Sequence, residues 1–156
     1  MKIIVDADAC PTKDIIENVA SKENIKLVFV CDNSHELTIN YGEVIQVDKG
    51  SDKADYKVVS MIKKEDLVIT QDYGLASLAL VKGARVLLNS GFVVDSYNIE
   101  SYLNYRYISS KARQAKIRTK NMPKRNLQDD DRFEKNLIKL IKKQWWISLH
   151  WCCYIK

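Results

Sequence analysis

The sequence predicts an α/β fold in which helices cover a central, mostly parallel sheet of about five strands. Short, continuous apolar runs rich in β-branched residues, such as residues 25–30, are typical of strands buried on both faces of a parallel sheet. These runs alternate over residues 1–88 with segments whose apolar side chains recur at helical spacing, which is the order that a parallel α/β sheet produces. The chain has 156 residues, of which 46% are hydrophobic, and this is enough for the core of one ordinary domain.

The N-terminal part of the chain is expected to form three strands and one helix. A short apolar run predicts the first strand at residues 2–5. Pro11 suits the first turn of a helix, and apolar side chains follow it at helical spacing, so we expect a helix over residues 11–21. Two further apolar runs predict strands at residues 25–30 and 43–47.

The next part repeats the same alternation. The spacing of apolar residues predicts a helix over residues 52–63, followed by a strand at residues 67–70. A turn at residues 72–74 leads into a second expected helix that runs through Val81. Gly83 is suited to end this helix because glycine readily adopts the left-handed conformation that follows a helix. Residues 85–88 then form the fifth expected strand.

The C-terminal part is expected to be helical, with helices over residues 97–114 and 133–143. No linker indicates a second domain, so residues 1–141 are interpreted as a single domain. Residues 142–156 differ sharply in composition, since they hold all three tryptophans and two of the four cysteines. They are either a packing or dimerisation element, so that a homodimer is one expectation, or a segment foreign to the domain.

Charge is distributed unevenly along the chain. Lysine and arginine number 25 against 20 aspartates and glutamates, a net charge of +5. Residues 101–128 contain no acidic residue, and without their eight basic residues the other 17 lysines and arginines leave the body at −3. Such a basic segment predicts contacts with RNA, and the tyrosines at its start would stack on bases; a solvated helix face is the alternative. The eight basic residues are Arg106, Lys111, Arg113, Lys116, Arg118, Lys120, Lys124 and Arg125.

Several features favour a cytoplasmic protein without a membrane span. The N-terminus passes within a few residues from a short apolar run into carboxylates, unlike a signal peptide. The four cysteines lack the density of a small secreted disulfide scaffold. No apolar run approaches the roughly 20 residues that span a membrane.

Five aspartates lie where a parallel α/β sheet places its chemistry, at the carboxyl ends of strands or the start of helices. Asp6 and Asp8 follow the first expected strand, and Asp72 follows the fourth. Asp52 and Asp55 open a helix. If the first and fourth strands are neighbours, these carboxylates converge, and their mutual repulsion favours Mg²⁺ or Mn²⁺ as an oxygen-bound cation. All five would be metal ligands, and Asp6, Asp8 and Asp72 the catalytic residues of phosphodiester hydrolysis.

Simpler roles exist for three of these aspartates. Asp52 and Asp55 suit a helix N-terminus without any further function. Asp72 precedes a Tyr-Gly pair, where it would act as a turn or cap residue. Asp6 and Asp8 are harder to explain structurally, because two carboxylates at the end of a central strand need compensation.

Other polar residues are candidates for substrate contacts. The expected substrate-binding residues are Lys13, Asn33, Ser34, Arg106, Lys111 and Arg113. The first three lie at the same expected edge of the sheet, although each also suits an ordinary surface position, and the last three belong to the basic segment. Cys10 is interpreted as a small buried residue rather than a nucleophile, since no general base is near it in the sequence.

Six motifs, taken together and in order, resemble the YaiI/YqxD family of uncharacterised bacterial proteins, which is similar in fold to PIN-like nucleases. DADACP (residues 6–11) is the most specific of them. The others are Asn33-Ser34, GSDKAD (residues 50–55), VITQD (residues 68–72), LASLALVKGARVL (residues 75–87) and DDDRF (residues 129–133). The match extends from Met1 to about Ile141, and the Trp-rich C-terminus departs from the family pattern. The resemblance implies a three-layer α/β/α PIN-like domain whose acidic residues map to Asp6, Asp8, Asp52, Asp55 and Asp72, and it supports nuclease chemistry by analogy only.

Three functions agree with these features, and a metal-dependent nuclease acting on RNA is the leading hypothesis. It would use the acidic cleft for Mg²⁺ or Mn²⁺ and the basic segment for phosphates. A non-catalytic nucleic-acid-binding or regulatory module would retain the fold without turnover. A phosphatase would use Asp6 as nucleophile and Asp8 as acid/base, because a strand ending in Asp-x-Asp also opens haloacid-dehalogenase-like phosphatases. Cys10 stands where those enzymes usually have threonine.

Overall fold

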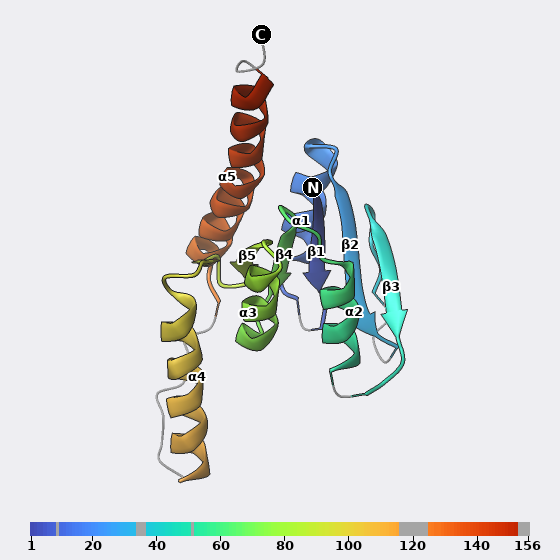
Figure 1. Ribbon diagram of the computed structural model, residues 1–156. Coiled ribbons are helices and arrows are strands. Elements are labelled where there is room, and N and C mark those ends of the chain that lie inside the picture. The colour runs from blue at the N-terminus through green and yellow to red at the C-terminus, as the bar shows by residue number, and fades with distance from the viewer. Residues whose placement is uncertain (9, 34–36, 51, 116–124, 153–156) are drawn as a thin grey trace.

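The computed structural model describes residues 1–8, 10–33, 37–50, 52–115 and 125–152, without the side chains of residue 113 and residues 143–152. Within this part of the chain the central sheet has six strands in the order β3-β2-β1-β4-β5-β6 (Figure 1). Neighbouring strands are parallel except for the antiparallel pair β5 and β6. The strands are β1 (Lys2–Asp6), β2 (Lys26–Asp32), β3 (Glu43–Val47), β4 (Leu67–Thr70), β5 (Arg85–Leu88) and β6 (Val93–Val94).

The predicted α/β class and mostly parallel sheet are confirmed. The bounds of β3, β4 and β5 agree with the sequence prediction residue for residue. β6 was not predicted because a strand of two residues is too short to show a periodic apolar pattern. It adds an antiparallel strand at one edge of an otherwise parallel sheet.

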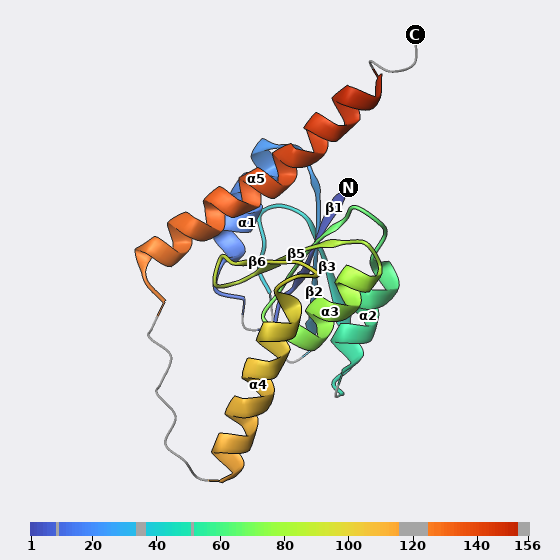
Figure 2. The same cartoon turned by 60° about the vertical axis from the view of Figure 1, so that its left-hand side comes forward.

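Helices cover both faces of the sheet, which gives a three-layer α/β/α arrangement (Figures 1 and 2). On one face α1 (Lys13–Lys22) and α5 (Leu127–Cys152) pack against the strands. On the other face lie α2 (Lys53–Met61) and α3 (Tyr73–Val81). α4 (Ile99–Gln114) packs on α3 rather than across the sheet.

A hydrophobic core lies on each face of the sheet, and β1 contributes side chains to both of them. Ile3 and Val5 pack with α1 and α5, whereas Ile4 packs with α2 and α3. Successive side chains of a strand point to opposite faces, and all three of these residues are fully buried. The carboxyl end of β1 therefore lies in the middle of the sheet, with neighbours on either side.

Local hydrogen bonds and backbone conformation shift some helix ends from their predicted positions. α2 begins at Lys53, because Asp52 has a left-handed backbone conformation with a φ of 63°. α4 begins at Ile99 rather than at residue 97. Before it, the Asp95 carboxylate accepts a 2.9 Å hydrogen bond from the backbone N–H of Tyr97, which forms a turn instead of helix.

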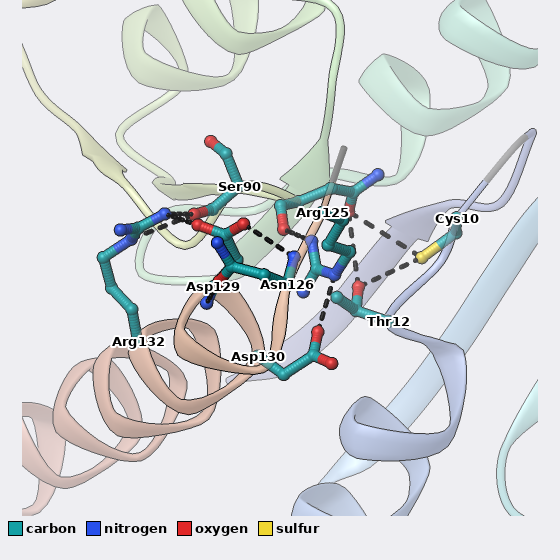
Figure 3. A network of polar contacts seen from close by, with 9 residues as sticks. Cys10, Thr12, Ser90, Arg125, Asn126, Asp129, Asp130 and Arg132 are labelled. Carbon is teal, nitrogen blue, oxygen red and sulfur yellow. Dashed lines mark hydrogen bonds and ion pairs between the residues drawn. The ribbon is translucent and has the colours of Figure 1, made fainter. Parts of the chain in front are cut away.

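α5 begins at Leu127, ahead of the predicted start at residue 133, because two side chains cap it reciprocally. The backbone N–H of Asn126 donates to Oδ2 of Asp129, and the backbone N–H of Asp129 donates to Oδ1 of Asn126, both at 3.0 Å. Figure 3 shows this cap at the start of the helix. The cap thus lets α5 begin several residues before its first apolar core residue, Phe133.

The first turns of α5 dock onto the turn between β5 and β6. Arg132 donates two hydrogen bonds to the Ser90 carbonyl, and Nδ2 of Asn136 donates to the Gly91 carbonyl at 2.8 Å (Figure 3 shows Arg132 and Ser90). Gly91 has a φ of +85°, and a Cβ there would lie 2.8 Å from the backbone nitrogen of the buried Phe133. Only glycine suits such a close approach. The DDDRF motif therefore has a structural role.

The C-terminal segment continues α5 as far as Cys152. The prediction that residues 142–156 serve packing or dimerisation concerns side chains that lie almost entirely outside the described residues, and it stays a prediction. In the part of the chain that the structure describes, no helix combines the length and the apolar composition that a membrane crossing requires.

Candidate functional site

The candidate site lies where the order of strands changes direction. β1 and β4 are neighbours, with Ile3 opposite Leu67 and Val5 opposite Ile69, and this is the arrangement in which the predicted aspartates converge. The chain proceeds from β1 to β2 and β3 on one side, and from β4 to β5 on the other. Open parallel sheets bind ligands outside the carboxyl ends of strands at such a switch point. The residues that follow β1 and β4 therefore occupy the usual ligand-binding position of this architecture.

Asp6 and Thr70 join the ends of these two strands. Oδ2 of Asp6 accepts a 2.8 Å hydrogen bond from Oγ1 of Thr70, a fully buried side chain. The same Oγ1 accepts a 3.0 Å bond from the backbone N–H of Asp72. The pKa of Asp6 is raised from 3.8 to about 6, mainly by burial and also by the charges of Asp55 and Asp8. The hydrogen bond from Thr70 offsets only part of this rise.

Asp55 lies in the first turn of α2 and faces the same place. The pKa of this carboxyl is raised first by burial and then by the charges of Asp72, Asp52 and Asp8. Asp52 occupies the N-cap position of α2, as its simpler role predicts, but its side chain makes no capping hydrogen bond to this helix. Each of the five predicted aspartates takes part in at least one such charge interaction. We call the group formed by Asp6, Asp8, Asp52, Asp55 and Asp72 the acidic edge.

Asp72 caps α3, which is the simpler of its two predicted roles, and its role as a metal ligand stays a prediction. Its Oδ1 caps α3 by accepting hydrogen bonds from the backbone N–H groups of Gly74, at 2.5 Å, and Leu75, at 3.2 Å. Nη1 of Arg106 also donates to Oδ1, at 3.0 Å. Burial acts to raise the pKa of Asp72, but these hydrogen bonds and the charge of Arg106 outweigh it, and the pKa is lowered. Asp72 is thus an ionised member of the acidic edge.

Asp8 reaches toward the end of β2. Its Oδ1 accepts a 3.3 Å hydrogen bond from the backbone N–H of Asp32, the last residue of that strand. Sequence reasoning missed both Asp32 and Thr70. The signal that could have found them is a polar residue at the last position of an otherwise apolar strand.

The structure brings one of the predicted substrate-binding side chains to the acidic edge. Arg106 extends from α4 to Asp72 while its side chain remains 51% exposed. Lys13 instead donates from Nζ to the Thr38 carbonyl at 2.7 Å, on a neighbouring loop. Asn33 follows β2 with an exposed side chain. Both residues therefore lie at this end of the sheet, and their contact with a substrate stays a prediction.

The remaining candidates belong to α4 or lie outside the described residues. Nζ of Lys111 lies 5.7 Å from the ring centroid of Tyr107, more than one helical turn beyond Arg106. The structure does not describe Ser34 or the side chain of Arg113. Their predicted substrate contacts stay predictions.

Cys10 belongs to a polar network on the β5 side of this edge (Figure 3). Its Sγ lies 3.4 Å from Oγ1 of Thr12 and 3.8 Å from Oδ1 of Asn89. Arg125 donates to the Asn89 carbonyl and, at 2.6 Å, to Asp130. Burial raises the pKa of the Cys10 thiol, which keeps it protonated near neutral pH. Cys10 is thus partly rather than fully buried, and its protonated thiol agrees with the interpretation that it is not a nucleophile.

The chemistry of the donors decides whether a divalent cation fits. Among the residues that the structure describes, no group of three or more His, Cys, Asp or Glu side chains is arranged to hold a metal ion by itself. Asp6, Asp8 and Asp55 nevertheless form an all-oxygen donor set whose mutual repulsion a cation would relieve. Mg²⁺ is commonly bound through one or two carboxylates together with waters and substrate phosphates. The donors are therefore of the type that an oxygen-bound cation uses, and waters or phosphate oxygens would have to supply its further ligands.

Comparisons with known proteins identify a family to which this chain is similar. The family described as "Uncharacterized BCR, YaiI/YqxD family" matches residues 4–143 of this chain. A "UPF0178 protein" of Natranaerobius thermophilus is 50% identical over 141 residues, covering 90% of this chain and 95% of its own. Those of Ruminiclostridium cellulolyticum and Clostridium tetani are each 44% identical, cover 92% of this chain, and match over 94% and 98% of their own lengths. No solved structure matches, so the similarity to PIN-like nucleases stays a prediction. The expectation drawn from the six motifs is confirmed, and the chain belongs to the YaiI/YqxD family of uncharacterised proteins.

Proposed function

We propose that this protein is a nuclease that hydrolyses RNA with Mg²⁺ or Mn²⁺ at the carboxyl ends of β1 and β4. The observation that supports this most directly is the position of the acidic edge at the topological switch point of the sheet, with Arg106 reaching it from α4. Without a cation, the carboxylates of the acidic edge would repel an RNA phosphate. Metal dependence is therefore a necessary part of the proposal.

The aspartates would have different tasks in this reaction. Asp6, Asp8 and Asp55 would hold the cation, because the charges of these carboxylates repel one another and burial raises the pKa of Asp6 and Asp55. Thr70 would orient Asp6 through its 2.8 Å hydrogen bond. When bound, the cation would lower the pKa of a water molecule and offset the charge of the phosphate. Hydrolysis adds the water oxygen to phosphorus, breaks the bond to the leaving sugar oxygen, and transfers a proton to that oxygen.

Arg106 and Asp72 would position the phosphate. Asp72 is held through Oδ1 by the start of α3 and by Arg106, which makes it a positioning residue in this scheme. The guanidinium of Arg106 carries five donor hydrogens and is half exposed. It can therefore retain Asp72 and donate to a phosphate oxygen at the same time.

Calorimetric titration with Mn²⁺, followed by an assay of RNA cleavage, tests the proposal. The parent protein is expected to bind Mn²⁺ and to cleave labelled RNA, and Asp8→Asn is expected to lose both properties. Asp14→Asn is the matched control, because the Asp14 side chain is 92% exposed on α1 and it should behave like the parent. Addition of EDTA should stop cleavage by the parent.

The same assays separate the two other functions. A non-catalytic module would bind RNA without cleaving it, both in the parent and in Asp8→Asn. A phosphatase would carry a phosphoryl group on Asp6, detectable by mass spectrometry of the acid-quenched protein, and would act little on polynucleotides. If the parent binds no divalent cation at millimolar concentration, the role assigned to Asp6, Asp8 and Asp55 is wrong.

A further inference from the structure

Helix α4 carries a group of aromatic side chains next to the acidic edge. Its first turns pack on α3, where the rings of Tyr73 and Tyr102 stack with centroids 5.3 Å apart and planes 16° from parallel. Beyond this contact α4 extends away from the sheet (Figures 1 and 2). Tyr105 and Arg106 follow Tyr102 by three and four residues, so they lie on the same side of the helix as the stacked pair.

Tyr105 offers an open aromatic ring beside a cation. The residue is 56% exposed. Burial raises the pKa of Tyr73, and both Tyr102 and Tyr105 contribute to the rise, which indicates that Tyr105 lies near the stacked pair. Arg106, the next residue, donates to Oδ1 of Asp72 at 3.0 Å. The exposed ring of Tyr105 therefore lies close to Arg106, whose guanidinium contacts the acidic edge through Asp72.

We infer that this place binds single-stranded RNA, with an unpaired base on Tyr105 and the adjacent phosphate on Arg106. The inference rests on the proposed function and narrows its substrate class. Every base has a flat face that can stack on an aromatic ring, whereas the bases of a duplex stack on one another and are not available. Arg106 would then connect the bound strand with the acidic edge.

Charge favours RNA over a second copy of this chain. Residues 101–128 hold eight basic and no acidic residues, so two copies meeting through α4 would bring like charges together. A polyanion instead gains from the same charges by releasing its own counterions. The segment that carries Tyr105 is therefore suited to a nucleic acid.

Tyr107 provides a matched comparison on the same helix. It is 64% exposed, but it follows Tyr105 by two residues, and residues at this spacing do not face the same side of a helix. The nitrogen of Lys111 lies over its ring. An exposed tyrosine of this kind needs no function. The inference therefore assigns the base to Tyr105 and not to Tyr107.

Fluorescence anisotropy of labelled oligouridylate tests the inference with the full-length protein in EDTA, where no cleavage occurs under the proposed mechanism. Tyr105→Ala is expected to weaken binding by about fivefold or more, as loss of one stacked base predicts. Tyr105→Phe should bind like the parent because it retains a stacking ring, and Tyr107→Ala should change affinity by less than about twofold. Circular dichroism of each variant checks that the fold is retained.

Three competitors identify the ligand. Unlabelled oligouridylate should displace the probe more strongly than an RNA duplex of the same length, and more strongly than oligothymidylate, which lacks the 2′-hydroxyl. Equal competition by the duplex, or equal losses in Tyr105→Ala and Tyr107→Ala, would overturn the inference. Preference for oligothymidylate would also overturn it, since the bound strand would then be DNA.

Failure of this inference can be distinguished from failure of the proposed function. Hydrolysis of bis(p-nitrophenyl) phosphate by the parent with Mn²⁺ tests the acidic edge on a phosphodiester that has no nucleobase. If the parent hydrolyses bis(p-nitrophenyl) phosphate but Tyr105→Ala binds RNA no more weakly than Tyr107→Ala does, the nuclease proposal stands and the base site at Tyr105 is rejected. Selective binding at Tyr105 without any hydrolysis would reject the nuclease and retain the single-strand site.

Discussion

Replacing Asp6 with asparagine is expected to stabilise the protein above pH 6 when no divalent cation is present. The pKa of Asp6 rises from 3.8 to about 6 on folding, so the folded protein binds this proton more tightly than the unfolded chain. The stability that comes from a raised pKa is fully present below pH 3.8 and is lost as the pH rises through about 6. Asparagine has no charge to bury, and its carbonyl can still accept the hydrogen bond from Thr70.

The magnitude follows from the difference between the two pKa values. At about 1.4 kcal/mol for each pKa unit, the rise from 3.8 to about 6 corresponds to about 3 kcal/mol. The free energy of unfolding of Asp6→Asn is therefore expected to exceed that of the parent by up to about 3 kcal/mol near pH 8. Near pH 4 the advantage of Asp6→Asn should almost vanish, because the Asp6 carboxyl group is then protonated in nearly every folded parent molecule.

Urea unfolding followed by circular dichroism in EDTA measures this difference at several pH values. Comparing Asp6→Asn with the parent at each pH cancels the contributions of the other titrating groups. Asp14→Asn is the control, because this exposed carboxylate should change the free energy of unfolding by less than about 0.5 kcal/mol.

Two outcomes would refute the reasoning. An equal gain near pH 4 and near pH 8 would mean that the charge of Asp6 is not what destabilises the parent. A loss of stability near pH 8 would mean that the carboxylate is already compensated within the fold. Addition of Mn²⁺ should reduce the difference in free energy of unfolding between Asp6→Asn and the parent, because the cation should stabilise the parent more.

Two further predictions concern the structure around the site. Asp72→Ala removes the cap of α3 and should lower the free energy of unfolding by about 0.5–2 kcal/mol near pH 7, whereas Asp72→Asn retains a capping oxygen and should cost less. Because the pKa of Asp72 is lowered on folding, urea unfolding should show the deficit of Asp72→Asn shrinking as the pH falls below 3.8. Gly91→Ala forces a Cβ to within 2.8 Å of the Phe133 nitrogen at a φ of +85°, and it should cost about 1–3 kcal/mol. An unchanged melting temperature in calorimetry would contradict that close approach.

The strands were predictable because their signal is local. β4 and β5 are short apolar runs, fully buried or nearly so, and each was predicted with its observed bounds. Sequence spacing could only suggest that β1 and β4 are neighbours, since strand order depends on pairing between distant segments. The early start of α5 escaped prediction because it depends on the reciprocal cap of Asn126 and Asp129 and not on apolar spacing.

The candidate site was predictable in its residue types and less so in its contacts. The five aspartates were recognised because they follow strands or begin helices, which sequence periodicity reveals. Thr70 was missed, since its role appears only when the ends of β1 and β4 are aligned. The contact of Lys13 with the Thr38 carbonyl could not be predicted, because the direction of a long side chain depends on the nearest loop.

The hydrogen bond between Thr70 and Asp6 also has a consequence for protein synthesis. The two residues are 64 positions apart, and Asp72 and Arg106 are a further 34 apart. A growing chain that has exposed only Asp6 and Asp8 holds two carboxylates without the partners that position a phosphate. Parallel pairing of distant strands is also a late and slow step in folding. If the protein cleaves RNA as proposed, unfinished chains would be inactive, and the ribosome that makes them would be spared until the whole sheet has formed.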